Sequence, residues 1–183
     1  MAGDIPTLGT ARLLLRPLEL ADADAVQRIF PQWEIVRFLA AGIPWPYPAD
    51  GALRFVRDEA LPAMEQGRGW YWSIRPKSSP GELIGLISLA DTPDDNRGFW
   101  LDPAWQGRGL MTEACREATR YWFEVLGRPV LRAPKAAANL PSRRLSERAG
   151  MRIVATKEKE YVSGRFLAET WEITVDEWRR QGG

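Results

Sequence analysis

The chain has 183 residues, 45% of them hydrophobic, a size and composition that suit one compact domain over residues 1–183. It carries 25 basic and 24 acidic side chains, so no global field recruits nucleic acid or an anionic membrane. Histidine is absent and Cys115 is the only cysteine, which excludes an intrachain disulfide, a Ser-His-Asp triad and the usual zinc sites, and we expect no metal.

The start of the chain gives no targeting signal. Met1 to Pro6 lacks the basic segment and apolar run of a secretion signal. No later stretch approaches the roughly 18 apolar residues that a membrane span needs. We therefore expect a cytoplasmic protein.

The first half of the chain predicts short strands and helices in alternation. Residues 10–18 form a predicted strand with Leu13 and Leu15 on its buried face. Asp22 and Asp50 are placed to cap two helices, the second running to about residue 64. The loop between these helices, residues 42–48, is held extended by alternating prolines. Turn-forming residues then separate three expected antiparallel strands, at residues 69–74, 82–90 and 97–101.

The most informative stretch lies between the last of these strands and a helix. Asp102-Pro103 ends the strand, and an apolar stripe predicts a helix over residues 107–126. Gly107 and Gly109 therefore stand at a helix N-terminus, where unpaired N–H groups and the helix dipole can bind a phosphate. The alternative is that both glycines only shape a tight turn. The spacing matches neither a P-loop nor a dinucleotide fingerprint.

The second half predicts further strands around one helix. We expect a strand at residues 130–133, a helix from Asn139 or Ser142 to residue 149, and strands at residues 151–155 and ending at Thr174. The chain is expected to fray after Trp178. These elements predict an α+β fold with a mixed, mainly antiparallel central sheet of about seven strands, flanked by about four helices.

Several separate motifs in this order resemble the GNAT superfamily of acyl-CoA-dependent N-acetyltransferases, over nearly the whole chain. The glycine turn, from Gln106 to Met111, matches the superfamily's Gln/Arg-x-x-Gly-x-Gly/Ala loop. The segments that begin at Asn139 and Glu147 match its Asn-x-x-Ser element and its Glu-Arg/Lys-x-Gly element. Met111 departs from the pattern, because glycine or alanine is usual there, and we expect its side chain to pack into the core.

Two further segments resemble one branch of the superfamily. The opening, residues 10–17, and the run of residues 109–114 are similar to the branch that includes the ribosomal-protein N-terminal alanine acetyltransferases, the RimJ/RimL-like enzymes. This resemblance implies acetyl-CoA as the acetyl donor and an amine as the acceptor.

The resemblance also implies how the cofactor is bound. The diphosphate would lie on the N–H groups of residues 107–111, and the pantetheine arm on the exposed backbone of residues 99–101. In such folds the strand before the glycine turn diverges from the strand after its helix, which makes room for that arm. The residues assigned to the cofactor are Phe99, Leu101, Gln106, Gly107, Arg108, Gly109, Leu110, Met111, Asn139 and Ser142.

Two residues are assigned to catalysis. The N–H near Leu101 would polarise the thioester carbonyl and support the oxyanion. Ser142 is the preferred acid for the departing thiolate, and the competing interpretation is that Ser142 only caps a helix. Asn139 could likewise bind the pantetheine or acceptor region, or cap the helix. Tyr161 is a second candidate acid.

The acceptor amine must be neutral to attack, and with a pKa of about 8 it needs only a modest base or bulk water. The sequence shows no evident base. The possible bases, each equally explained as a solvated surface carboxylate, are Asp91, Glu82 and Glu160. A basic cluster is expected near the CoA end and consists of Arg143, Arg144 and Arg148. The solvated face of a helix explains these arginines equally well.

Aromatic side chains gather in the first half, where this fold closes its acceptor pocket. Those assigned to the acceptor are Trp33, Trp45, Tyr47 and Trp72. Prolines on both sides hold Trp45 and Tyr47 in a loop that cannot easily bury both rings.

We therefore expect direct acetyl transfer to a primary amine in a ternary complex, with a protein N-terminal α-amine as the acceptor. One alternative is a small-molecule amine, such as an antibiotic, a polyamine or an amino-acid derivative. Another, from a different class, is a CoA-binding regulatory module without turnover. The chain is expected to act as a monomer or a homodimer.

Overall fold

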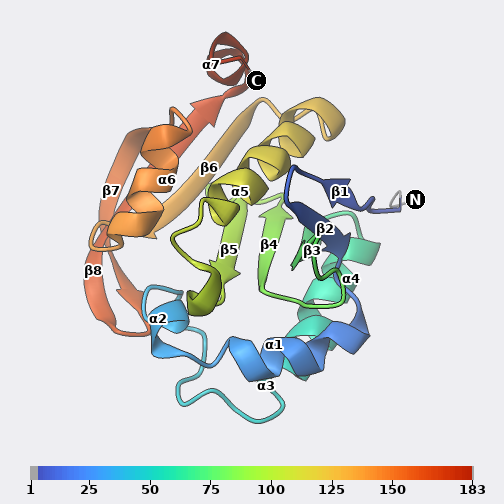
Figure 1. The fold of residues 1–183 in the computed structure, drawn as a ribbon. Helices are drawn as coiled ribbons and strands as arrows, with labels where there is room; N and C mark the ends of the chain where they lie inside the picture. The colour runs from blue at the N-terminus through green and yellow to red at the C-terminus, as the bar shows by residue number, and fades with distance from the viewer. Residues whose placement is uncertain (1–3, 183) are drawn as a thin grey trace.

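The computed structural model describes residues 4–182, in which the strands form two antiparallel sheets (Figure 1). Residues 1–3, part of the segment expected to lack a secretion signal, and residue 183 lie outside the described residues. The first sheet has the order β1 (Leu8–Gly9), β2 (Leu13–Pro17), β3 (Gly69–Pro76), β4 (Gly85–Ala90), β5 (Arg97–Leu101). The second has the order β6 (Val130–Ala136), β8 (Gly164–Thr174), β7 (Arg152–Tyr161).

Helices cover both faces of the first sheet (Figure 1). On one face α5 (Leu110–Arg120), continued by a π-helical segment (Tyr121–Val125), lies beside α6 (Leu140–Arg148), which covers the second sheet. The other face carries a 3-10 helix (Leu20–Asp22), α1 (Ala23–Ile29), α2 (Trp33–Val36), α3 (Gly51–Arg54), a π-helical segment (Phe55–Ala60) and α4 (Leu61–Glu65). The expected α+β class is confirmed, with the sheet divided in two.

Alternating side chains on the strands form two cores. Leu13 and Leu15 of β2 are fully buried in the core beneath α5, which confirms the predicted buried face. Leu86 of β4 points to the opposite face and packs with Val26 and Val56 of the short helices. The first sheet is therefore largely apolar on both faces.

The two sheets are joined at one end and separate at the other. Asn96, just before β5, donates its N–H to the carbonyl of Arg132 in β6 at 2.7 Å, and the Arg132 N–H donates to Asn96 Oδ1 at 2.8 Å. Further along, β5 pairs only with β4, and β6 only with β8. The predicted divergence of the strands on either side of the motif helix is confirmed.

The two predicted aspartate caps are wrong, although both helices begin where expected. Asp22 is buried and pairs with Arg75 of β3 at 2.5 Å, and Asp50 pairs with Arg54 at 2.6 Å. Neither side chain accepts a hydrogen bond from the first turn of its helix. A carboxylate that finds a guanidinium forms a charge-assisted pair instead of a cap.

The predicted fraying after Trp178 is also wrong, because a helix, α7 (Val175–Arg180), extends past it. Thr174 Oγ1 accepts from the Glu177 N–H at 3.2 Å, and Glu177 Oε2 accepts from the Thr174 N–H at 2.8 Å. This reciprocal capping box stabilises the first turn of α7.

Candidate active site

The glycine turn connects β5 to α5 through two left-handed glycines. A 3-10 helix, Pro103–Trp105, follows β5 and is capped by Asp102, whose Oδ1 accepts from the Ala104 N–H at 3.0 Å. Gly107 and Gly109 both have φ of +76°, which strains any residue with a Cβ. A Cβ on Gly107 would meet nothing within 4 Å. Glycine is thus needed here for the turn itself, and the space beside Gly107 stays open.

The N-terminus of α5 offers free donors next to that space. The first N–H that bonds back into the helix is that of Glu113, to the Gly109 carbonyl at 3.2 Å. The N–H groups before it lie at the positive end of the helix dipole, which favours an anion. Met111 is buried with the core residues under α5, so its large side chain leaves the turn unobstructed.

An N-terminal strap, which the sequence did not reveal, holds the turn in place. Arg12 Nη1 donates to the Arg108 carbonyl at 2.9 Å, and Arg12 Nε pairs with Glu113 Oε2 at 2.9 Å. The Arg12 N–H and the Thr10 hydroxyl both donate to Glu113 Oε1. The partners are about 100 residues apart, so no local pattern could have shown the contact.

Two side chains of the turn fold back onto it. Gln106 Nε2 donates to the Leu101 carbonyl at 2.9 Å. Arg108 Nη2 donates to the Ala104 carbonyl at 3.1 Å, and its guanidinium lies 5.0 Å from the centre of the Trp105 ring. Arg108 must leave these contacts to reach a bound phosphate.

The backbone of β5 presents a free edge where the sheets separate. The Ala90 N–H donates to the Asn96 carbonyl at 2.9 Å, and the Asp102 N–H donates to the Ile84 carbonyl at 2.8 Å. Hydrogen-bonded positions alternate along an antiparallel pair. The N–H groups of Phe99 and Leu101 therefore point away from β4, toward the side on which β6 diverges.

Asn139 and Ser142 lie together at the start of α6, across the divergence from β5. Asn139 Oδ1 accepts from the Ser142 N–H at 3.4 Å and caps the helix. The interpretation of Ser142 as the cap is therefore wrong, because Ser142 lies inside the first turn. Capping occupies only the carbonyl oxygen of the Asn139 side chain, so its amide group remains available to a ligand.

A buried lysine lies under this turn. Lys135 of β6 donates from Nζ to the Ser142 carbonyl at 3.1 Å and also bonds the Ser146 hydroxyl. Burial and the charge of Arg97 lower the pKa of Lys135 to about 7, against the opposing influence of Cys115 and Glu169. Nothing in the sequence distinguished this lysine from surface lysines.

The second candidate acid, Tyr161, lies at the end of β7. Its side chain is buried, and its hydroxyl has no hydrogen-bond partner among the described residues. Burial, and to a smaller extent the charge of Asp95, raise the pKa of Tyr161. An unpaired buried hydroxyl is costly, so Tyr161 is available to a ligand that reaches it.

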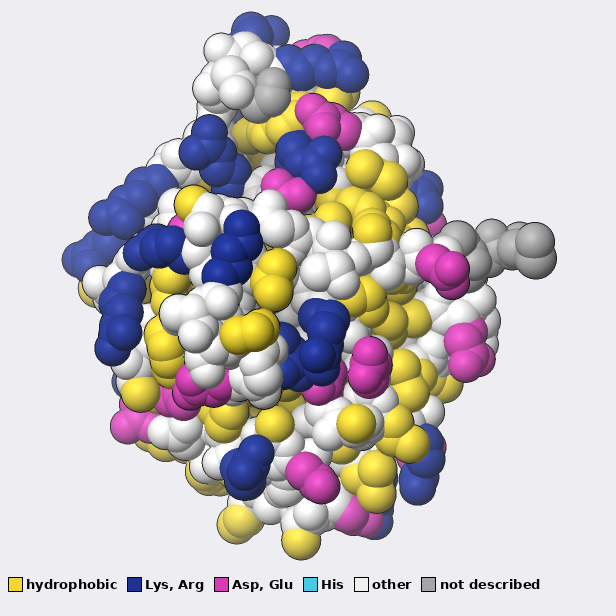
Figure 2. Space-filling view, turned by 45° about the vertical axis from the view of Figure 1, so that its right-hand side comes forward, with side chains coloured by type: hydrophobic (Ala, Val, Ile, Leu, Met, Phe, Trp, Pro, Cys, Tyr) yellow, Lys and Arg dark blue, Asp and Glu magenta, His cyan; other side chains and the backbone are white. Residues whose placement is uncertain are grey.

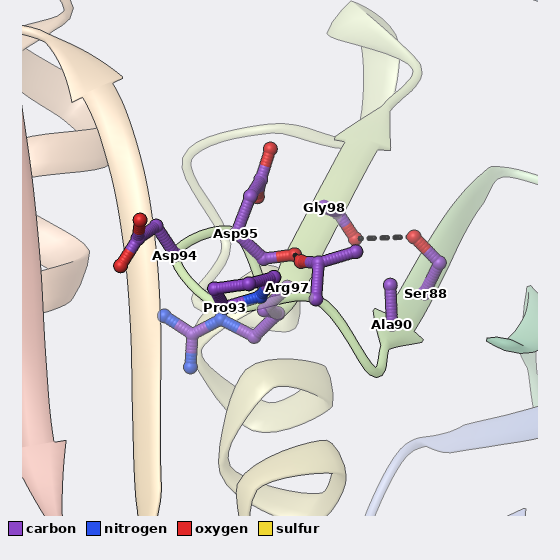
Figure 3. Close-up of a pocket in the computed structure, with 8 residues that line it drawn as sticks. Ser88, Ala90, Pro93, Asp94, Asp95, Arg97 and Gly98 are labelled. Atoms are coloured by element: carbon purple, nitrogen blue, oxygen red, sulfur yellow. Dashed lines mark hydrogen bonds between the residues drawn. The ribbon is translucent and has the colours of Figure 1, made fainter. Parts of the chain in front are cut away.

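The possible bases lie at the surface, and two further carboxylates, Asp94 and Asp95, line a hollow. Asp91 pairs with Arg128 at 2.8 Å, and Glu82 and Glu160 are exposed. Asp95, which sequence analysis assigned only to a turn, lines a cavity of about 420 Å³ (Figure 3). Loss of solvation raises its pKa, against a lowering by Lys159.

This hollow opens on the face of the first sheet that carries the short helices. Ser88 and Gly98 line it, and the Ser88 hydroxyl donates to the Gly98 carbonyl at 3.5 Å (Figure 3). Both positions are in phase along their strands with Leu86 and Trp100, which contact α1–α4. The hollow and the α5 turn thus lie on opposite faces of β5.

The aromatic residues assigned to the acceptor separate into two groups. Trp33 and Trp45 are 43% and 41% exposed, with ring centres 5.7 Å apart. Tyr47 is half-buried against Phe30, and burial raises its pKa to about 12. The expectation that the loop leaves one ring exposed is thus met by Trp45.

The assignment of Trp72 to the acceptor is wrong. Trp72 is fully buried in the main core, its ring centre lies 5.2 Å from that of Tyr121, and its Nε1 donates to the Pro6 carbonyl at 2.9 Å. A side chain at this central position of β3 contacts no surface. Trp72 is therefore removed from the acceptor residues.

A comparison with known protein families agrees with these features of the site, which are the free donors at the α5 turn, the free edge of β5 and the Asn139 turn. Residues 12–152 match the acetyltransferase (GNAT) domain. The chain belongs to the GNAT family. It is an acetyl-CoA-dependent N-acetyltransferase, and a CoA-binding module without turnover is no longer favoured.

Individual relatives of this GNAT chain are distant but cover most of it. FsC-acetyl coenzyme A-N(2)-transacetylase of Aspergillus fumigatus is 27% identical over 96% of the chain and 79% of its own length. RimJ of Mycobacterium smegmatis, solved with CoA-disulfide, has a TM-score of 0.82 at 20% identity over 96% of this chain and 90% of its own. Ribosomal-protein-S5-alanine acetyltransferase of Vibrio fischeri has a TM-score of 0.79 at 14% identity, over 94% and 98%.

The GNAT fold accounts for the co-substrate without a metal. Acetyl-CoA is the co-substrate, and the open space at Gly107 with the donors of α5 suits its diphosphate. Within the described part of the chain, no group of Cys, Asp and Glu side chains could hold a metal ion. Among residues 4–182 we also find no helix long and apolar enough to cross a membrane.

Proposed function

We propose that this enzyme acetylates a protein N-terminal α-amine by direct attack in a ternary complex. The observation that carries the proposal is the acceptor side: an exposed pair of tryptophans, Trp33 and Trp45, and an open hollow. An open aromatic surface suits the end of a polypeptide, which brings backbone and side chains past the reacting amine. The names of the RimJ and S5-alanine acetyltransferase neighbours support the same acceptor.

The chain's own groups would serve each step of the transfer. Acetyl-CoA supplies a thioester, whose carbonyl carbon forms the new N–C bond as the C–S bond breaks. The Leu101 N–H would donate to the carbonyl oxygen, a contribution of about 3 kcal/mol in comparable sites. Ser142 would give its hydroxyl proton to the thiolate and recover a proton from water, while the amine loses its own to solvent.

The cofactor contacts follow from the free donors already described. We infer that Gly107, Gly109, Leu110 and Met111 offer backbone N–H groups to the diphosphate, and that Arg108 turns from Ala104 to join them. Gln106 would hold the end of β5 in place, since its amide bonds the Leu101 carbonyl. The N–H groups of Phe99 and Leu101, with the free amide of Asn139, would line the pantetheine arm.

A small-molecule amine is the second candidate acceptor. It is favoured by the relative from Aspergillus fumigatus, whose name is that of an N(2)-transacetylase and which covers 96% of the chain. The hollow beside Asp95 also has room for a compact amine, whose positive charge the carboxylate would attract.

A thiol-release screen decides between these acceptors. The enzyme and acetyl-CoA are incubated with peptides of different N-terminal residues, with polyamines, with amino-acid derivatives and with antibiotics. We expect the highest kcat/KM for a peptide, with mass spectrometry placing the acetyl group on its α-amine. An N-formylated copy of that peptide is the matched control and should release no thiol. A higher kcat/KM for a small amine would overturn the proposal.

A further inference from the structure

A second cavity lies among the helices, on the other side of Arg97 from the hollow beside Asp95, and Arg97 lines both. The second cavity measures about 250 Å³ and lies between α5, α6 and the end of α7. Apolar side chains line part of it, including Leu145 and Trp178. Its polar lining is strongly one-sided, because it includes Arg97, Arg116 and Arg148 but no Asp or Glu among the described residues.

Arg97 is the unusual member of this lining. The residue is only 5% exposed, yet no carboxylate of residues 4–182 pairs with it. Its Nη1 donates to the Thr119 hydroxyl at 3.0 Å, its Nη2 has only the Met151 sulfur at 3.6 Å, and its buried Nε has no partner. A buried guanidinium without a counter-ion is costly to fold, and an anion in the cavity would relieve that cost.

The other two arginines extend the positive lining to the surface. Neighbouring arginines such as Arg120 and Arg143 form ion pairs. Among the described residues, the exposed Arg116 and Arg148 have no acidic partner. Figure 2 shows Lys and Arg side chains gathered at the upper left of the molecule, below the C-terminal end. Burial and then the charge of Arg97 lower the pKa of Lys135, whereas burial raises the pKa of Cys115 against an opposing influence of Arg97.

The cavity is distinct from the proposed diphosphate turn. Arg97 begins β5 at the end where Asn96 and Arg132 still join the sheets, about 13 Å of strand from Leu101. On α5, Arg116 lies about 9 Å along the helix from Leu110. Arg97 and Arg116 therefore begin well away from the proposed diphosphate turn.

We propose that the cavity between α5, α6 and α7 is a binding site for a phosphate anion, held by Arg97 from inside and by Arg116 and Arg148 from the rim. Guanidinium groups bind phosphate oxygens through paired N–H donors, and three of them from two helices and a strand converge here. The bound anion would bridge α5 and α6, the two helices that carry the cofactor residues. The site does not depend on the identity of the acetyl acceptor.

Calorimetry and thermal unfolding of the full chain with sodium phosphate test the site, with sodium chloride at equal ionic strength as the reference. We expect saturable, phosphate-specific binding and a rise in Tm that follows it. Arg148→Ala and Arg116→Ala should each weaken binding about tenfold, since each removes a charged donor. Both positions are exposed, so these variants should fold even if Arg97→Met does not.

Arg144→Ala is the matched control, because Arg144 is exposed on α6 but does not line the cavity. It should leave phosphate binding unchanged. A Tm that rises equally in phosphate and chloride, or that rises in Arg148→Ala as in the parent, would overturn the proposal.

A second experiment separates free phosphate from a phosphate carried by the co-substrate. Phosphate is titrated into the enzyme saturated with CoA, and the affinities for CoA and 3′-dephospho-CoA are compared in the parent and in Arg148→Ala. We expect phosphate to bind with CoA present, and the CoA to dephospho-CoA ratio to be the same in both proteins. Competition by CoA, with a ratio that collapses in Arg148→Ala, would show a co-substrate contact and overturn an independent site.

Discussion

Ser142 and Tyr161 are the two hydroxyls proposed as acids for the departing thiolate, and their surroundings differ. Ser142 lies in the first turn of α6, which Asn139 caps, so its hydroxyl is not needed to begin the helix. Tyr161 is buried beside Phe166, and its hydroxyl is unpaired. The two residues can therefore be tested without removing a structural hydrogen bond.

We expect Ser142→Ala to lower kcat about tenfold with little change in either KM or in Tm. The loss is small for a general acid, because a thiolate leaves readily without a proton. Steady-state kinetics with both substrates and a thermal melt measure it. Tyr161→Phe is the companion variant, which keeps the ring and should keep kcat. If Tyr161→Phe loses more activity than Ser142→Ala, the roles of the two residues are reversed.

Trp45 tests the acceptor side. Because the Trp45 ring is exposed, Trp45→Ala should change the stability of the fold little. We expect it to raise the KM for the acceptor about tenfold or more and to leave the KM for acetyl-CoA unchanged. Val125→Ala, which truncates another exposed apolar side chain at the end of the π-helical segment, is the control. Unchanged acceptor kinetics in Trp45→Ala would remove this loop from the site.

At the scale of elements, the strap of residues between β1 and β2 holds the glycine turn at the start of α5. Glu113 accepts from Thr10 and from both the backbone and the side chain of Arg12. Partial burial raises the pKa of Glu113, but these hydrogen bonds outweigh it and lower the pKa overall. The same arginine reaches the Arg108 carbonyl inside the turn.

Removing this carboxylate should therefore loosen the turn. We expect Glu113→Ala to weaken acetyl-CoA binding about tenfold, by freeing Arg12 and with it the Arg108 backbone, while the KM for the acceptor stays the same. Calorimetry with CoA measures the change. Glu117→Ala is the matched control, since Glu117 lies one turn further along α5 and pairs with Arg120 instead. Equal losses in both variants would mean that the strap has no special role.

Elements with strong local signals could be predicted from the sequence, and those fixed by distant partners could not. Alternation placed β2, turn residues placed the three central strands, and the glycines placed the start of α5, because backbone preferences act within a few residues. Asp22 was wrongly predicted to cap a helix, because its partner Arg75 is 53 residues away and no local pattern shows the pair. Trp72 was given to the acceptor pocket because aromatic composition does not tell which face of a strand is buried.

The cofactor side was more predictable than the acceptor side for the same reason. Its groups are backbone N–H donors placed by a short glycine motif and by one helix start. The proposed acceptor site draws on the Trp45 loop, the Asp95 turn and the end of β7, which are far apart in the sequence, as are the paired residues Ala40 and Tyr161. No local pattern encodes such a meeting point.

At the scale of the whole molecule, buried ionisable side chains collect between the two sheets. Lys135 of β6 lies directly across from Glu169 of β8, which also pairs with Arg143 of α6 at 3.0 Å. Arg97 of β5 and Cys115 of α5 face the same interior from the other sheet. The interface between the halves is thus partly ionic, and its stability must depend on pH.

The direction of that dependence follows from Lys135. Its pKa is lowered from 10.5 to about 7 in the fold, chiefly by burial. Between these values the unfolded chain binds more protons than the native one, so the free energy of unfolding rises with pH. This rise in the free energy of unfolding from Lys135 is complete above pH 10.5 and absent below pH 7. Burial raises the pKa of Cys115, which opposes the trend only at higher pH, so the window from pH 7 to 8.5 isolates the lysine.

Urea unfolding across this window gives the test. We expect the free energy of unfolding to rise by about 1 kcal/mol per pH unit in the parent protein, and to be nearly flat in Lys135→Met, whatever that variant's absolute stability. Lys157→Met, an exposed position on β7, should keep the parent's slope. A parent slope that survives in Lys135→Met would assign the titration to another group. A flat parent profile would mean that Lys135 stays protonated, held by Glu169 across the strand pair.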